Sequence, residues 1–179
     1  MKFRECIPAA KLVISGMIFA AATADAQQAK LPSTHAKSLS GQSVTVPAAN
    51  SVTLVIVGFT KASSTADNAW WKQAEPLCRT NSRITCYEAA VLESVPRLVR
   101  SMVVGSMKKG VPAGHQDSFL TVFENESQWK QAFGYSSPDD AYVALVDGSG
   151  NFLWKTHGNA SAANGAVISE AMRSAHLGD

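Results

Sequence analysis

A nearly continuous apolar run, rich in β-branched side chains, is the feature that most limits how this chain can fold. The run covers residues 52–59 and reads VTLVIVGF. Apolar residues on both faces are typical of a strand that other layers cover on both sides. We therefore expect a central strand here, inside an α/β fold.

A helix is predicted directly after this strand. Ser64 with Asp67 three residues later resembles a capping box, and the apolar residues that follow have helical spacing as far as Leu77. Pro76 is expected to kink or end this helix. The other predicted elements are strands at 44–46, 84–92, 119–123, 141–146 and 151–155, and helices at 96–109, 125–133 and from 161 onward.

This order of elements predicts the fold class. Strands separated by helices pair in parallel through right-handed crossovers, whereas 141–146 and 151–155 flank a glycine-containing turn and form a hairpin. The sequence therefore predicts an α/β sandwich with a mixed central sheet of about five strands flanked by helices.

The N-terminus has the pattern of a secretory signal peptide. Lys2 and Arg4 precede a short apolar run at 12–22, and Ala24-Asp25-Ala26 offers a cleavage site. We interpret 1–26 as a signal peptide, 27–42 as a flexible leader and 43–179 as one domain, which predicts a periplasmic or secreted protein. A retained membrane anchor is the alternative, although the run is shorter than the roughly 20 residues that span a bilayer.

Charge and motifs exclude several classes of function. The chain has 16 basic and 14 acidic residues, and this near balance argues against a nucleic-acid partner. Its four histidines lack metal-ligand spacing and no glycine-rich phosphate loop is present, so we expect neither a metal nor another cofactor. The basic side of 96–109 allows contact with anionic lipid headgroups but does not indicate it, because a solvated face is the favoured explanation. The apolar side of the same helix is expected to be core.

Several segments resemble redoxin domains, the group of peroxiredoxins and periplasmic thiol–disulfide reductases. They are SLSGQSVTVP, VTLVIVGFT and VALVDGSGNFLWKTHG, within a resemblance that covers residues 38–176. The resemblance implies a thioredoxin-like fold. However, the positions of the group's two redox cysteines fall on Ser63 and Ala66, and Pro138 lies three residues before Ala141 rather than next to the hairpin.

One branch of this superfamily fits the absence of the cysteine pair and the displaced proline better. The chain is similar to the mitochondrial ATP-synthase assembly-factor family, which lacks the CxxC motif, at Tyr142, Leu145, Val146, Asp147, Trp154, Gly158 and Ala160. This resemblance implies a chaperone or assembly factor whose partner is another protein, such as a membrane-protein subunit. The first helix departs from that family's Trp-x-x-Pro-Phe spacing.

Two cysteines remain once the signal peptide is removed. Cys78 and Cys86 in an oxidising compartment favour a disulfide. Two inert buried thiols, or a catalytic thiol pair, are the alternatives that the sequence leaves open. Catalysis would need a lowered thiol pKa, and the end of a helix does not favour a thiolate.

The leading hypothesis is a redox-inactive binding, chaperone or assembly factor, with a thiol-dependent oxidoreductase or peroxidase as the alternative. Its binding groove is predicted where the first helix starts and at the residues before the hairpin: Ser63, Ser64, Thr65, Trp70, Trp71, Pro138, Asp139 and Asp140. The hydroxyl residues there are expected to cap the helix rather than act as nucleophiles. Adjacent helical residues point about 100° apart, so one tryptophan should be core and the other partly exposed.

Overall fold

The apolar run at 52–59 forms the middle of a seven-stranded sheet in the computed structural model, which describes residues 29–176. Strand β3, Val52–Gly58, pairs in parallel with β4, Ile84–Val91, and antiparallel with β6, Ala141–Val146. Every residue of β3 after Val52 is buried. The prediction of a central strand covered on both faces is therefore confirmed.

The sheet is mixed, as the order of elements predicts. Strands follow one another in the order β2-β1-β5-β4-β3-β6-β7, with β3, β4 and β5 parallel and β6 and β7 forming an antiparallel hairpin. The remaining elements are β1 Thr34–Ser38, β2 Ser43–Val46, α1 Ser64–Thr80, α2 Arg97–Gly110, the 3₁₀ turn η1 Ala113–His115, β5 Phe119–Val122, α3 Glu126–Phe133, β7 Phe152–Gly158 and α4 Ala162–His176. The predicted α/β class is confirmed.

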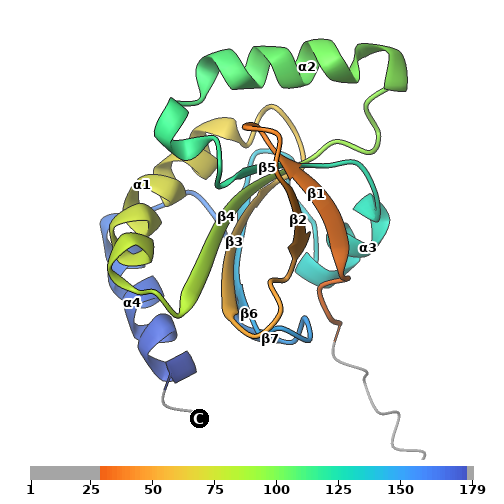
Figure 1. Cartoon of the computed structure of the whole chain (residues 1–179). Helices are drawn as coiled ribbons and strands as arrows, with labels where there is room; N and C mark the ends of the chain where they lie inside the picture. Colours follow the sequence, from red (N-terminus) through yellow and green to blue (C-terminus); the bar gives the residue numbers. More distant parts are fainter. Residues whose placement is uncertain (1–28, 177–179) are drawn as a thin grey trace, which may run out of the picture.

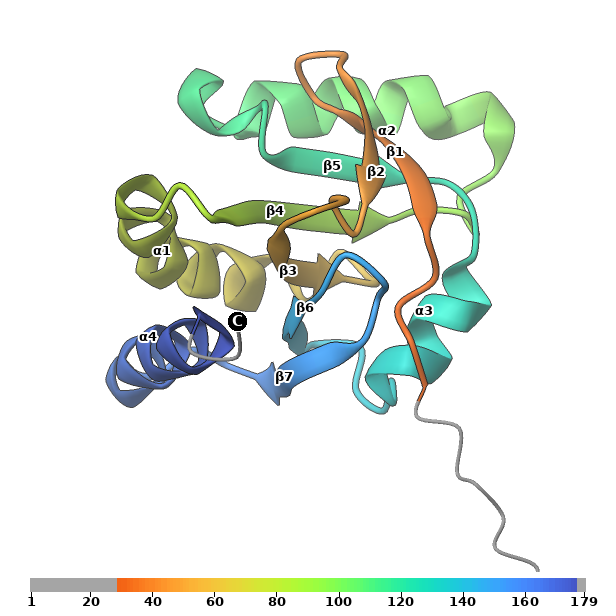
Figure 2. The same cartoon turned by 60° about the horizontal axis from the view of Figure 1, so that its bottom comes forward.

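Helices cover both faces of the sheet (Figures 1 and 2). Helices α1 and α4 lie together on one face, α3 lies on the other, and α2 lies beside β5 at the end of the sheet away from α4. Trp70 and Ile168 pack on the α1 face, whereas Trp129 and Phe133 fill the α3 face. The fold therefore has two apolar cores, one on each side of the sheet.

The sheet has seven strands rather than about five, and β1 is the strand that the sequence did not predict. It lies at 34–38, inside the segment expected to be a flexible leader, so that expectation is wrong for these residues. Its sequence, THAKS, is polar and lacks the apolar alternation typical of a strand. Pairing with β2 on one side and β5 on the other decides its structure instead.

Helix α2 is present where predicted, but the expectation that its apolar stripe belongs to the core is wrong. None of its residues is buried. Leu98 is 95% exposed and Met102 is 68% exposed. The spacing of apolar residues predicted the helix correctly. Whether another layer covers its apolar side depends on tertiary packing, which that spacing does not specify. Likewise, Pro76 lies inside α1 without ending it.

Residues 1–28 and 177–179 lie outside the described part of the chain, so the predicted signal peptide at 1–26 stays a prediction. Within residues 29–176, no helix combines the length and the apolarity that crossing a membrane requires.

Candidate functional site

The first turn of α1 follows the carboxyl end of β3, where the redox cysteines of redoxin domains were expected to fall. Ser63 is fully buried and its hydroxyl lies 2.8 Å from Asp67 Oδ2 and 3.0 Å from the carbonyl oxygen of Thr60. It makes no capping bond to the helix backbone. A capping residue normally has non-helical backbone angles, whereas Ser63 has φ −70° and ψ −13°. The capping prediction is therefore wrong.

Three titratable side chains from different elements meet beneath this turn. Asp67 comes from α1, Glu88 from β4 and His115 from η1, and all three are buried. Glu88 Oε2 lies 3.2 Å from His115 Nε2, although the two atoms do not have hydrogen-bond geometry. The ring of Trp71 stacks on that of His115 with 4.0 Å between centroids. The ring of Phe119 meets the His115 ring edge to face on the other side, with 5.6 Å between centroids.

Gly58 at the end of β3 makes room for this cluster. A Cβ atom at this position would lie 2.3 Å from Asp67 Oδ2 and 2.8 Å from Ser63 Oγ. Both distances are too short for any side chain larger than hydrogen. The absence of a side chain at Gly58 lets Ser63 and Asp67 approach the strand and bond to each other.

Burial changes the protonation of the cluster. Desolvation raises the pKa of Asp67 to about 7, against a smaller lowering by the Ser63 hydroxyl. Desolvation and then repulsion from Asp67 raise the pKa of Glu88 to about 8. Burial lowers the pKa of His115, with partial compensation from Glu75. Burial therefore favours the protonated forms of Asp67 and Glu88 and the neutral form of His115.

The Ser63 hydroxyl lies within hydrogen-bond distance of two acceptors. A serine hydroxyl has one proton to donate and can also accept bonds. It donates either to Asp67 Oδ2 over 2.8 Å or to the Thr60 carbonyl oxygen over 3.0 Å, and the bond to Asp67 lowers the pKa of that carboxyl. Within the described chain, no three Cys, His, Asp or Glu side chains lie close enough together to hold a metal ion.

The structure brings together the two segments that were predicted to form a groove. Thr60 Oγ1 donates to the carbonyl oxygen of Pro138 over 2.6 Å, which joins the loop after β3 to the loop before β6. Ser64, Thr65, Pro138 and Asp139 are exposed there. Asp140 is half-buried and lies 2.7 Å from His157 Nδ1.

Three members of the predicted groove cannot contact a partner. Ser63, Trp70 and Trp71 are buried, and the expectation that one tryptophan is partly exposed is wrong. Trp70 donates from Nε1 to the Gly158 carbonyl oxygen over 2.8 Å, at the end of β7. Trp71 lies under His115. Both tryptophans of α1 are buried because His115 of η1 covers Trp71, a contact that helical spacing alone does not predict.

Cys78 and Cys86 form a disulfide, with 6.1 Å between their Cα atoms. It joins the last part of α1 to β4, and Cys86 is 8% exposed. The favoured sequence interpretation is thus confirmed, and the alternative of two inert thiols is wrong. Among residues 29–176, these are the only cysteines, and neither lies in the first turn of α1.

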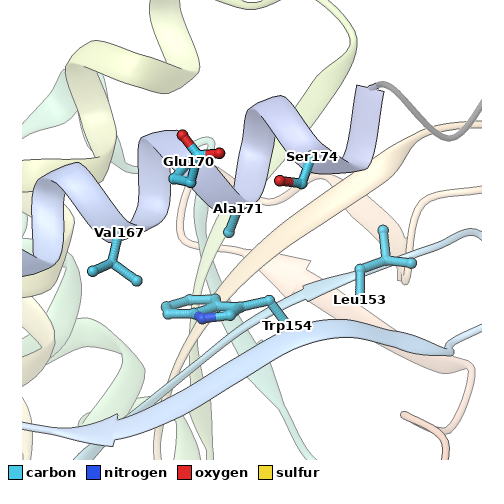
Figure 3. Close-up of a pocket in the computed structure, with 6 residues that line it drawn as sticks. All are labelled: Leu153, Trp154, Val167, Glu170, Ala171 and Ser174. Carbon is cyan, nitrogen blue, oxygen red and sulfur yellow. The ribbon is translucent and has the colours of Figure 1, made fainter.

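A pocket of about 530 Å³ lies between β7 and α4, away from the first turn of α1. Figure 3 shows Val167 and Ala171 of α4 facing Trp154 of β7, with Leu153 beside it. Leu153 is 47% exposed and Val167 is 44% exposed. The pocket adjoins β7, which is the last strand of the sheet and pairs only with β6 among the described strands.

Sequence reasoning did not single out Glu88, His115, Leu153 or Val167 as site residues. For Glu88 a signal existed, because an acidic residue inside the apolar segment 84–92 is unusual for a covered strand. His115 lies in a loop, and only the tertiary contact with Trp71 and Glu88 distinguishes it. No sequence pattern distinguishes Leu153 and Val167, because their exposure depends on β7 being the last strand of the sheet among the described strands.

Comparison with known proteins identifies the fold. Neither protein-family models nor curated protein sequences match this chain. Among solved structures, it is similar to the exposed lipoprotein thioredoxin Etrx1 from Streptococcus pneumoniae, with a TM-score of 0.56, 8% identity and coverage of 79% of this chain and 99% of that one.

Two further structures come from the Sco family. BsSco, a member of the Sco family of cytochrome c oxidase assembly proteins, has a TM-score of 0.58, 13% identity and coverage of 84% and 96%. Yeast Sco1 has a TM-score of 0.55, 15% identity and coverage of 83% and 97%. At these identities the likeness shows the fold alone. The chain has a thioredoxin-like fold, as the resemblance to redoxin domains implied.

Proposed function

We propose that this protein is an exported, redox-inactive thioredoxin-like protein that binds another polypeptide as an assembly factor or chaperone. The observation that carries the proposal is the apolar pocket between β7 and α4 beside the open edge of the sheet. Its lining is mainly apolar and its volume of about 530 Å³ is in the range of binding pockets. An extended segment can add to an open strand edge through backbone hydrogen bonds and place alternate side chains in a neighbouring pocket.

The first turn of α1 supports redox inactivity. The position of the first expected cysteine is Ser63, a buried hydroxyl bonded to Asp67 and Thr60. The two cysteines of the described chain are joined at the other end of this helix. A dithiol at the helix start is the group that disulfide exchange would need, because the helix dipole favours a thiolate there.

The fold neighbours are compatible with either an assembly role or a redox role. BsSco is described as a cytochrome c oxidase assembly protein, and its structure is described as revealing a disulfide switch. Etrx1 is described as an exposed lipoprotein thioredoxin. Together with the N-terminal signal pattern, these neighbours favour an exported protein. The resemblance to the ATP-synthase assembly-factor family favours a membrane-protein subunit as the partner.

Photo-crosslinking tests the binding role and distinguishes the two candidate surfaces. A photoreactive residue at Leu153 or Val167 samples the pocket, one at Ser64 or Thr65 samples the predicted groove, and one at exposed Lys72 is the matched control. We expect one dominant crosslinked polypeptide from the pocket positions and none from Lys72. The same polypeptide should bind Leu153→Glu protein at least about tenfold more weakly, about 1.4 kcal/mol. The absence of a specific polypeptide at all four positions would contradict the proposal.

Thiol chemistry tests the rival function. We expect the purified protein to show no insulin reduction and no peroxide consumption. A rapid, reversible activity that is lost in Cys78→Ser protein would instead establish a thiol-dependent oxidoreductase that uses Cys78 and Cys86.

A further inference from the structure

We propose that α2 docks the protein on a membrane surface rich in anionic lipid headgroups. The exposed apolar side chains of α2 enter the headgroup region and its cations bind lipid phosphates. This inference does not depend on the pocket between β7 and α4 or on the partner that binds there.

The first observation is that α2 is the least covered helix of the described chain. Helices α1, α3 and α4 each bury large side chains in the two cores, whereas α2 buries none. Figures 1 and 2 show α2 beside β5, apart from the other helices. A surface helix normally turns its apolar side chains toward the core. The most exposed large apolar side chains of the described chain, Leu98 and Met102, instead lie on α2.

The second observation is the charge around these side chains. Residues 94–116 contain four basic residues and no acidic residue, in a chain whose total charges nearly balance. Arg100 serves the fold, because its guanidinium donates to the carbonyl oxygens of Val95 and Glu93 and lies over the ring of Phe123. The other three cations, Arg97, Lys108 and Lys109, are exposed.

Helix geometry places Lys109 on the same side as Leu98 and Met102, whereas Arg97 and Lys108 lie roughly 80–100° to one side of it. Leu98 and Met102 are four residues apart and Lys109 follows seven residues later, so the three lie on one face of the helix. Arg97 and the two lysines lie at opposite ends of α2, which is roughly 21 Å long at 1.5 Å per residue. A helix with protruding apolar side chains flanked by cations is typical of helices that lie in the membrane interface.

The geometry favours a membrane over an acidic protein. Leu98 is 95% exposed, and α2 lies at the outer edge of the molecule in Figure 2. Protein partners require a complementary surface with a packed apolar centre. A bilayer interface needs no such shape, because lipids rearrange around the inserted side chains, and cations near an anionic surface add to the attraction.

Vesicle binding of the full chain tests this inference. Wild-type protein, Leu98→Gln/Met102→Gln protein and Lys108→Gln/Lys109→Gln protein are sedimented with phosphatidylglycerol–phosphatidylcholine vesicles and with phosphatidylcholine vesicles alone. The matched control is Lys37→Gln/Lys72→Gln, which removes two exposed cations elsewhere on the molecule. Residues 1–28 are the same in every variant, so a difference between variants belongs to the substituted side chains.

We expect wild-type protein and the lysine control to bind the anionic vesicles equally, and each α2 variant to bind at least about tenfold more weakly. Raising the salt to about 0.5 M should weaken wild-type binding, because salt screens the cations. Hydrogen exchange should slow at residues 97–110 when anionic vesicles are added.

Three results would overturn the inference. They are equal binding to both kinds of vesicle, α2 variants that bind like wild type, and unchanged hydrogen exchange of α2 on vesicle-bound protein. Salt-sensitive binding of α2 to an acidic polypeptide, without vesicle binding, would assign this face to a protein partner instead.

Discussion

Asp67 and Glu88 retain protons at pH values where exposed carboxyl groups have lost them. Their pKa values rise from 3.8 to about 7 and from 4.5 to about 8, mainly because burial disfavours the charged form. The folded protein therefore binds these protons more tightly than the unfolded chain does. Stability from the two groups is fully present below their unfolded pKa values and is lost as the pH rises through about 7 and about 8.

Replacing Asp67 by Asn should reduce this pH dependence. Asparagine keeps the hydrogen bond to Ser63 and cannot ionise, so it mimics the protonated carboxyl. We expect wild-type protein to lose on the order of 2–3 kcal/mol between about pH 6.5 and pH 9, and Asp67→Asn protein to lose about 1 kcal/mol less. Urea unfolding at both pH values measures this difference.

The control for this prediction is Asp139→Asn, which changes an exposed carboxyl in the loop before β6 and should leave the pH dependence unchanged. The pH range begins at about 6.5 because the lowered pKa of His115 has the opposite effect below that value. An equal loss of stability in wild-type and Asp67→Asn protein would show that Asp67 ionises normally in the fold.

At the scale of elements, the Cys78–Cys86 disulfide ties the end of α1 to β4. The two cysteines are eight residues apart in sequence. The bond therefore closes a short loop, in which only residues 81–83 lie outside α1 and β4. A disulfide stabilises a fold mainly by restricting the unfolded chain, and a short loop gives a modest effect. Its role here is therefore predicted to be structural.

Removing the disulfide should destabilise the protein without unfolding it. We expect Cys78→Ser/Cys86→Ser protein to lose about 2–3 kcal/mol of unfolding free energy, measured by urea unfolding. Wild-type protein in a reducing agent should fall to the same stability, whereas the double variant should not respond to that agent. A double variant as stable as oxidised wild type would rule out a structural contribution of the bond.

At the scale of the whole molecule, long-range hydrogen bonds connect strand β1 to α3. Trp129 of α3 is fully buried and donates from Nε1 to Thr34 Oγ1 over 2.9 Å, across 95 residues of sequence. Asn125 Nδ2 donates to the same oxygen over 3.3 Å. One hydroxyl in β1 thus satisfies two donors at the start of the α3 layer.

Replacing Thr34 by Val should destabilise the whole fold. The substitution keeps the shape of the side chain but leaves the indole NH of Trp129 buried without an acceptor, which costs about 1–3 kcal/mol. Thermal or urea unfolding measures the loss. Thr45→Val in β2 is the matched control, because Thr45 is exposed and its loss should cost less than about 0.5 kcal/mol. Equal stability of the two variants would mean that Thr34 does not link β1 to α3.

The sequence by itself determined most of the elements and the class of fold. Apolar periodicity and turn residues are local, so β3, α3 with its stop at Gly134, and the β6–β7 hairpin could all be predicted. Their order predicted an α/β sandwich with a mixed sheet, and the resemblance to redoxin domains implied the thioredoxin-like fold. Ser63 and Ala66 at the expected redox positions, and the pairing of the two remaining cysteines, were also accessible from sequence.

Only the tertiary structure decided what is buried and what stays exposed. The meeting of Asp67, Glu88 and His115 depends on three elements far apart in sequence, and so does the burial of both tryptophans. The polar strand β1 forms because its neighbours supply hydrogen-bond partners. Helical periodicity specifies that α2 has an apolar side, but only long-range packing determines whether another layer covers that side, and here Leu98 and Met102 remain exposed.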